Sequence, residues 1–146
     1  MLEIPVKKMM KGEPLMVASS TSIVRTVCRK MAERGISAVV VVDKKVVVGI
    51  FTERDAVFRV MAQDRDPAST RLRDVMTPDP ATVAPADTFG HALALMHERG
   101  FRHLPVVENG RPVGMVTARD ALDPDLDDFV CEVQRRKAIR RPTPPA

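Results

Sequence analysis

The sequence contains no tryptophan and no tyrosine, and five phenylalanines bring the aromatic content to only 3% of 146 residues. A hydrophobic core must therefore be built from aliphatic and methionine side chains. The hydrophobic content of 45% is that of an ordinary globular chain. Few aromatic rings also means few surfaces on which nucleic-acid bases could stack. This scarcity counts against a nucleic-acid-binding protein.

Cysteine and long apolar runs are scarce as well. Cys28 and Cys131 are the only two cysteines, and we expect both to be reduced thiols in a cytoplasmic protein. No apolar run approaches the roughly 20 residues that cross a bilayer. The N-terminus also lacks the apolar segment of a secretory signal peptide. We therefore expect no membrane partner.

The residue patterns of common catalytic and metal sites are missing too. The three histidines, His91, His97 and His103, have no cysteine partners, no metal-ligand spacing and no His-Glu-x-x-His sequence. There is no Walker-type Gly-x-x-x-x-Gly-Lys loop, and no arrangement pairs a nucleophile with a base. We expect neither an enzyme, nor a metal site, nor a cofactor that acts as a catalyst.

Positive charge is concentrated at the C-terminal end, although the net charge of the chain is only +4. The cluster consists of Arg135, Arg136, Lys137, Arg140 and Arg141. It has two interpretations. The cations could contact nucleic acid or an acidic partner. Alternatively, they form a solvated helix end that suits the negative end of the helix dipole, which is the interpretation we favour.

The most informative feature present is an internal duplication. Residues 49–55 (GIFTERD) return as residues 114–120 (GMVTARD), 65 positions later. Eleven of the 32 residues from 24 to 55 are identical to their counterparts from 89 to 120, without a gap. A repeat of this length is one supersecondary unit that cannot bury its apolar face alone. We therefore expect a paired structure in which any site exists in two versions.

Each copy predicts a first helix and a hairpin. Apolar residues at helical spacing, among them Val24, Val27, Cys28, Met31 and Ala32, indicate a buried helix face in the first copy. We expect its cap at Ser22 and its end at Gly35, and in the second copy a cap at Asp87 and an end at Gly100. The valines at 39–42 predict a buried strand that returns over 46–51. In the second copy, Asn109-Gly110 is a strong hairpin signal.

The remaining elements complete the unit. A second helix should start at Thr52 or Thr117, with Val57, Val60 and Met61 as its apolar positions in the first copy. A short extended segment precedes each first helix, at 15–17 and at 81–83. These segments are offset by 66 residues, which places one extra residue of the first copy near residues 19–21.

The predicted fold class is α+β, with two β-α-β-β-α repeats packed sheet against sheet about a pseudo-twofold axis. The chain divides into the first repeat with its N-terminal segment at 1–63, a linker at 64–74, the second repeat at 75–122, and a C-terminal region at 123–146. This last region predicts a helix from about Pro124 to Arg141 and a basic, proline-rich tail.

The pattern Gly-x-x-Thr-x-x-Asp carries the candidate chemistry. A glycine at the end of a strand permits the close approach of another group. The threonine then begins a helix, whose free N–H groups attract anions, and the aspartate can accept hydrogen bonds from the two hydroxyls of a ribose. The competing interpretation is a capping box, in which the carboxylate folds back onto the helix end. Its occurrence in both copies favours the binding site.

The layout and these two endings resemble the tandem cystathionine-β-synthase (CBS) domain pair, also called a Bateman module. The sequences VMTP at 75–78 and HLPVV at 103–107 add to the resemblance, which extends from about Val6 to Leu122. It implies a disc-like regulatory module whose two clefts between the copies bind adenosine-containing ligands: AMP, ADP, ATP, S-adenosylmethionine or sometimes NAD. It also implies a homodimer, and we expect a separate effector protein.

The resemblance assigns roles to individual residues. Asp55 and Asp120 would accept hydrogen bonds from the ribose, and Thr52 and Thr117 would contact ribose or phosphate. Adenine would lie against backbone and apolar side chains near the first strand and the hairpin: Val17, Ala18, Ile36 and Ala38 in one copy, and Val83, Phe101 and Leu104 in the other.

The two copies differ at the place where phosphate would lie. The second copy has Arg102 and His103 before Leu104 and Pro105, whereas the first has Ser37 and Ala38 at the matching positions. Arg102 is always cationic and His103 sometimes is, so both could contact phosphate and the second cleft should prefer phosphorylated nucleotides. A surface ion pair with Glu98 is the alternative for Arg102. Arg54 and Arg119 either reach phosphate or pair with Glu53 and neighbouring acids.

The leading hypothesis is therefore a non-enzymatic sensor of adenine nucleotides, with clefts of one design and unequal affinity. Two alternatives stay open. The chain is a structural dimerisation module whose Thr-x-x-Asp segments only cap helices, or it binds nucleic acid through its basic C-terminus.

Overall fold

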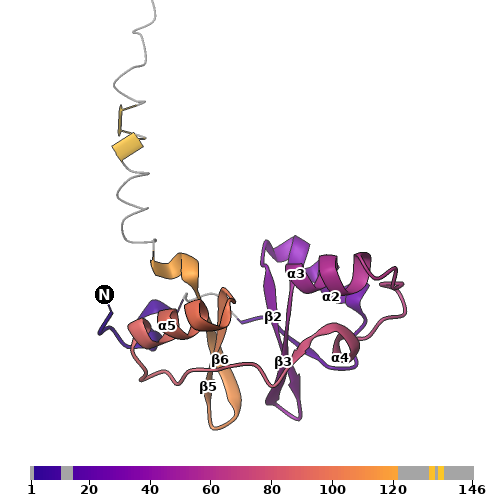
Figure 1. Cartoon of the computed structure of the whole chain (residues 1–146), viewed down its shortest axis with the longest axis horizontal. Coiled ribbons are helices and arrows are strands. Elements are labelled where there is room, and N and C mark those ends of the chain that lie inside the picture. Colours follow the sequence, from indigo (N-terminus) through magenta and orange to yellow (C-terminus); the bar gives the residue numbers. More distant parts are fainter. Residues whose placement is uncertain (1, 11–14, 122–131, 134, 137–146) are drawn as a thin grey trace, which may run out of the picture.

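The computed structural model describes residues 2–10, 15–121, 132–133 and 135–136. It is an α+β structure with two halves side by side, each containing an antiparallel hairpin and a helix of 11 residues (Figure 1). The hairpin strands of the two halves lie next to each other, and Val47 N donates a 3.0 Å hydrogen bond to Gly110 O across the boundary. The predicted fold class is confirmed.

The first half contains a four-stranded sheet in the order β1-β2-β3-β4. Strand β1 (Val17–Ser19) runs parallel to β2 (Ala38–Asp43), which pairs antiparallel with β3 (Val46–Thr52). The edge strand β4 (Thr77–Pro78) then pairs antiparallel with β3. The middle of β2 is fully buried, as its run of valines predicts.

The second half contains the hairpin of β5 (His103–Glu108) and β6 (Arg111–Thr117). Its predicted leading strand is reduced to one parallel bridge between Val83 and Val106. The predicted Asn-Gly turn is confirmed, with φ values of 52° and 76° at Asn109 and Gly110. Consecutive positive φ angles are typical of a two-residue hairpin turn.

The helix ends agree with the sequence better than the helix starts. Helix α2 (Val24–Arg34) ends at Gly35 with φ 62°, and α5 (Phe89–Arg99) ends at Gly100 with φ 72°. Both predicted caps are wrong by one residue, because Ile23 caps α2 and Thr88 caps α5. For α2 the reason is tertiary. The first N–H group, at Val24, donates to the Thr70 carbonyl at 2.9 Å, so no side-chain cap is required.

The helix after β3 departs from regular α geometry. Helix α3 (Glu53–Asp55) continues directly as the π-helix η1 (Ala56–Met61), and in the second half the 3₁₀-helix η2 (Ala118–Ala121) follows β6. Of the three apolar positions predicted for this helix, only Val60 is buried, whereas Val57 and Met61 are 48% and 75% exposed. The π turn changes the spacing, because its hydrogen bonds span five residues and residues three apart, such as Val57 and Val60, no longer share one face as they do in an α-helix.

Two short helices pack against the half to which sequence order does not assign them. Helix α1 (Val6–Met9) precedes the first repeat, yet Val6 is fully buried in the core of the second. Helix α4 (Leu72–Val75) leads into the second repeat, yet Leu72 and Val75 are buried in the core of the first. The predicted boundaries follow chain order, whereas the packing crosses them. We call this the exchange of α1 and α4: each short helix contributes to the core of the other half, which joins the two halves.

The exchange also locates the extra residue of the first copy. Met10 packs against Gly114, and Met76 packs against Gly49, so these methionines occupy equivalent places 66 residues apart. The strand pairs Ala18–Val41 and Val83–Val106 are related by an offset of 65. The extra residue therefore lies between Met10 and Ala18, and the predicted position near residues 19–21 is wrong.

Within the described residues, no helix is long and apolar enough to cross a membrane. The predicted helix from about Pro124 to Arg141 lies almost wholly outside the described part of the chain, as does Cys131. Of the basic cluster, Arg135 and Arg136 are described. Arg136 Nε donates to one Glu132 carboxylate oxygen at 2.7 Å, and Arg135 Nη1 lies 4.0 Å from the other.

Candidate functional site

The two Gly-x-x-Thr-x-x-Asp segments occupy matching places, at the end of β3 and at the end of β6. Each places its aspartate in the first turn of the following helix. Asp55 is 8% exposed and Asp120 is 3% exposed. Charged groups are rarely this buried unless they are partnered, so each carboxylate is held in place by its surroundings.

In the first repeat, Thr52 and Asp55 form a capping box. The Thr52 N–H and hydroxyl donate to Asp55 Oδ2 at 2.9 and 3.3 Å, and the Asp55 N–H donates back to the Thr52 hydroxyl at 3.4 Å. In the second repeat, the Thr117 N–H donates to Asp120 Oδ2 at 2.7 Å. The capping interpretation is thus correct for the local geometry. Capping does not use all the acceptor sites of the carboxylate, of which there are about four, so each aspartate can accept further hydrogen bonds.

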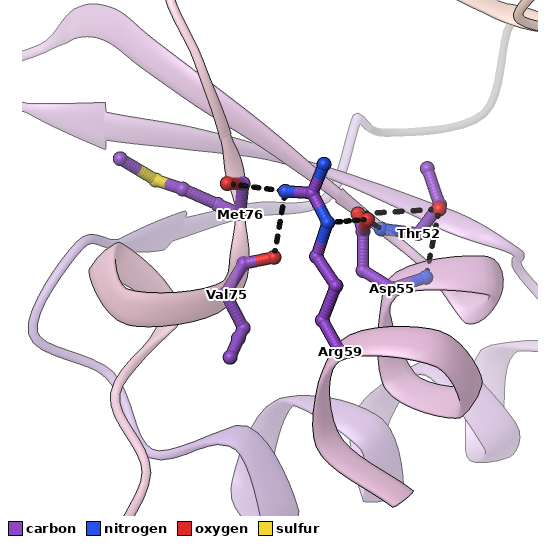
Figure 2. Close-up of polar contacts among 5 residues, drawn as sticks. All are labelled: Thr52, Asp55, Arg59, Val75 and Met76. Carbon is purple, nitrogen blue, oxygen red and sulfur yellow. Dashed lines mark hydrogen bonds and ion pairs between the residues drawn. The ribbon is translucent and has the colours of Figure 1, made fainter. Parts of the chain in front are cut away.

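The other oxygen of Asp55 faces Arg59, one helical turn further along η1 (Figure 2). Arg59 Nε lies 3.5 Å from Asp55 Oδ1. Arg59 Nη1 donates to the carbonyls of Val75 and Met76 at 3.3 and 2.9 Å. One guanidinium therefore joins Asp55 to the end of α4, the segment that packs on the first half although it leads into the second repeat. Sequence reasoning missed Arg59, although the Asp55/Arg59 spacing of four on a helix was a usable signal.

A direct contact between candidate residues crosses from one repeat to the other. Ser37 Oγ and His103 Nε2 form a hydrogen bond of 2.8 Å. The two are not matching positions in the duplication, because His103 matches Ala38 and Ser37 matches Arg102. Two of the residues that differ between the copies in sequence therefore contact each other across the two repeats.

Charged groups from both repeats surround His103. Burial is the main cause of its lowered pKa, because it disfavours the imidazolium ion. The carboxylate of Glu53 raises the pKa, Arg102 lowers it, and Asp120 raises it. The net direction is downward, so the imidazole is neutral at pH 7. Its predicted role as a cationic phosphate contact is therefore weakened, and Arg102 is left as the cation of this pair.

The predicted arginines lie at the surface. The Arg54 guanidinium is 5.0 Å from the ring centre of Phe58, an arrangement typical of a cation–π contact. Arg102 and Arg119 are exposed. The backbone at residue 102 is fixed, because the Ala118 N–H donates to the Arg102 carbonyl at 3.0 Å. The Glu53 N–H makes the matching bond to the Ser37 carbonyl at 2.9 Å.

The residues predicted to line the adenine differ in accessibility between the copies. In the first copy Val17 is exposed, and Ala18, Ile36 and Ala38 are half-buried. In the second copy the side chains of Val83 and Leu104 belong to the core and Pro105 is buried, whereas Phe101 is half-buried. The residues of the first copy therefore offer more accessible apolar surface than those of the second.

A hollow of about 630 Å³ lies elsewhere, at the turn end of the second hairpin. Its lining includes Lys7 and Met10 from the N-terminal segment, residues 84–86, residues 107–109 and Val113. None of these residues was a candidate from sequence. In the described part of the chain, no group of three or more His, Cys, Asp or Glu side chains is placed to hold a metal ion.

Comparisons with known proteins identify the family. The CBS domain profile matches residues 6–62 and 72–126. An uncharacterized protein of Methanopyrus kandleri is 37% identical over 110 residues, which cover 74% of this chain and 56% of that protein. The chain spans about half, or less, of the lengths of the curated relatives it matches.

Solved structures agree. A protein with CBS domains from Burkholderia ambifaria is 32% identical, with a TM-score of 0.76 over 86% of this chain and 96% of that one. A CBS domain protein from Pyrobaculum aerophilum, solved in complex with AMP, is 27% identical, with a TM-score of 0.73 over 80% of this chain and 89% of that one. The duplicated sequence, the paired fold and these matches lead to one conclusion: the chain belongs to the CBS domain family and carries two copies of the domain.

Proposed function

We propose that this chain is a non-enzymatic regulatory module that binds an adenosine-containing ligand between its repeats. AMP, ADP or ATP is the leading class, with NAD and S-adenosylmethionine as further candidates. Binding would change the conformation of the module or its dimer geometry, and a separate effector protein would respond to that change. A ligand shifts the populations of two conformations only to the extent that it binds one of them more tightly than the other.

The observation that carries this proposal is the pair of buried carboxylates, Asp55 and Asp120, at the start of matching helices. Each is oriented by the N–H group of its threonine. A fixed carboxylate beside a helix start is suited to the vicinal hydroxyls of a ribose. The Pyrobaculum relative solved with AMP supports the same ligand class.

Isothermal titration calorimetry with AMP, ATP, NAD and S-adenosylmethionine tests the proposal. Asp55→Asn and Asp120→Asn remove the charge but keep an oxygen that can cap the helix. We expect each variant to lose affinity at its own cleft, while Glu33→Ala, which removes an exposed carboxylate of α2, binds as the wild type does. A folded wild-type protein that binds none of the four ligands would refute the sensor.

The structural dimerisation module is the second candidate. Val57, Phe58 and Met61 are 48%, 52% and 75% exposed along η1, and together they form an apolar surface. Such a surface suits contact with a second copy of the chain. The replacement Phe58→Glu should convert a dimer into monomers in light-scattering measurements. A dimer that forms without any ligand affinity would favour this alternative over the sensor.

A further inference from the structure

The geometry of Arg59 points to a route by which the first cleft communicates with the second repeat. We propose that Arg59 couples the ribose acceptor Asp55 to the segment through which the chain passes from one repeat to the other. Ligand bound at Asp55 then strengthens the hold of Arg59 on that segment. This inference rests on the proposed binding of an adenine nucleotide.

The first step concerns the carboxylate. Asp55 Oδ2 is held by Thr52 and Asp55 Oδ1 by Arg59, so both oxygens have a fixed direction before any ligand arrives. A ligand that meets an ordered acceptor does not have to order it, which improves affinity. Arg59 acts here through Asp55 and is a positioning residue.

The second step concerns the far end of the guanidinium. Arg59 Nη1 bonds the carbonyls of Val75 and Met76, the last residue of α4 and the residue after it (Figure 2). Packing also holds these residues, because Val75 is in the first core and the Met76 sulfur rests on Gly49. The next residues, Thr77 and Pro78, pair with β3 as β4. A change at Asp55 therefore reaches the strand that leads into the second repeat.

The third step concerns the chemistry of the side chain. A guanidinium presents five N–H donors in a rigid fork, whereas an ammonium group is a compact point charge. Only arginine can hold the carboxylate and two carbonyls together in this arrangement. The duplication offers a natural contrast, because the residue 65 positions after Arg59 is Pro124. A proline side chain has no N–H donor, so the sequence does not repeat the guanidinium at the matching position.

The coupling must be reciprocal. If the ordered segment favours ligand at Asp55, ligand at Asp55 must stabilise the segment by the same factor. Several amides report on its order, because the N–H groups of Leu72, Arg73 and Met76 donate to Ser22, Ser20 and Leu72 carbonyls at 3.0, 2.9 and 2.7 Å. Their hydrogen exchange measures how often the segment opens.

Hydrogen exchange at residues 72–76, with and without AMP, tests the proposal in the full chain. The variants are Arg59→Lys, which keeps the charge, and Arg59→Met, which keeps much of the apolar stem. Both should exchange faster than wild type without ligand, and AMP should slow exchange in wild type but not in either variant. Calorimetry should show a loss of AMP affinity at the first cleft of about two- to tenfold, the range expected for one unordered side chain.

Matched variants at the two aspartates separate the possible failures. Asp55→Asn should abolish the effect of AMP on residues 72–76, whereas Asp120→Asn should leave it in place. Binding of AMP with equal slowing in wild type and Arg59→Lys overturns the coupling but leaves the proposed function intact. AMP binding that Asp120→Asn weakens and Asp55→Asn does not also overturns the coupling, because the ligand would then not contact Asp55. If wild type binds another of the four ligands instead, that ligand replaces AMP in these experiments. Binding of none of the four overturns the proposed function, and the ligand coupling with it.

Discussion

Met10 packs against Gly114 so closely that its Sδ atom would collide with a β-carbon on that residue. Met76 packs against Gly49 in the same way in the other half. Each methionine belongs to an exchanged segment, and each glycine belongs to the returning strand of a hairpin. The glycine of Gly-x-x-Thr-x-x-Asp therefore permits the close approach that its position predicts, and a methionine side chain makes that approach.

Gly114→Ala should destabilise the protein, because the new methyl group forces the Met10 side chain to move. We expect the free energy of unfolding to fall by about 1–3 kcal/mol, the usual cost of overpacking a core position. Urea denaturation measures the change. Met10→Ala removes the obstacle, so in a double-mutant cycle the two replacements should cost less together than the sum of their separate costs. Additive costs would show that the two residues do not constrain each other.

Val6→Ala should weaken the second repeat, although Val6 precedes the first repeat in sequence. Val6 is fully buried in the second core, and removal of two buried carbons should lower the free energy of unfolding by about 2 kcal/mol. Hydrogen exchange should accelerate at β5 and β6 more than at β2 and β3. Leu2→Ala, at a side chain that is 59% exposed, is the control and should change stability by less than about 0.5 kcal/mol. Faster exchange confined to the first half would contradict the exchange of α1.

His103 should make stability depend on pH below its ordinary pKa. Its pKa in the fold is lowered, mainly by burial, so below about 6.5 the unfolded chain binds a proton more readily than the folded one. The free energy of unfolding should therefore fall as pH drops from 6.5 towards the lowered pKa of the folded state. Chemical denaturation between pH 7.5 and 5 measures this, with the range set about the ordinary histidine pKa of roughly 6.5.

His103→Gln should flatten that pH profile, because glutamine cannot be protonated but can still bond to Ser37. Its own effect at pH 7 should be small for the same reason. A variant that keeps the full pH dependence of the wild type would assign that dependence to other groups.

Arg102→Met should reduce affinity for AMP more than affinity for adenosine. A hydrogen bond from a guanidinium to phosphate contributes about 1.5–3 kcal/mol, which corresponds to roughly ten- to a hundredfold in affinity. Calorimetry with both ligands separates the phosphate from the nucleoside. Arg99→Met, at another exposed arginine, should alter neither. An equal loss for AMP and adenosine would mean that Arg102 supports the cleft without contacting phosphate.

Local elements were predictable where a short-range pattern decides them. Gly35 and Gly100 end their helices because glycine adopts positive φ at little cost. The cap of α2 was misplaced because a loop carbonyl, that of Thr70, accepts the first helical N–H group, so Ile23 can stand at the helix start without a capping side chain. The exposure of Val57 and Met61 did not follow from their apolar spacing, because that spacing assumes an α turn and this helix forms a π turn.

The sequence alone determined the duplication, the helix–hairpin–helix order in each repeat and the two aspartates at matching helix starts, because these depend on residue type and short spacing. Only the tertiary structure decided which half receives each short helix, and that Ser37 of one repeat bonds to His103 of the other. It also decided that Arg59 reaches the carbonyls of Val75 and Met76. Such contacts join residues far apart in the chain, and periodicity, which records only which face of an element is apolar, contains no information about what lies opposite.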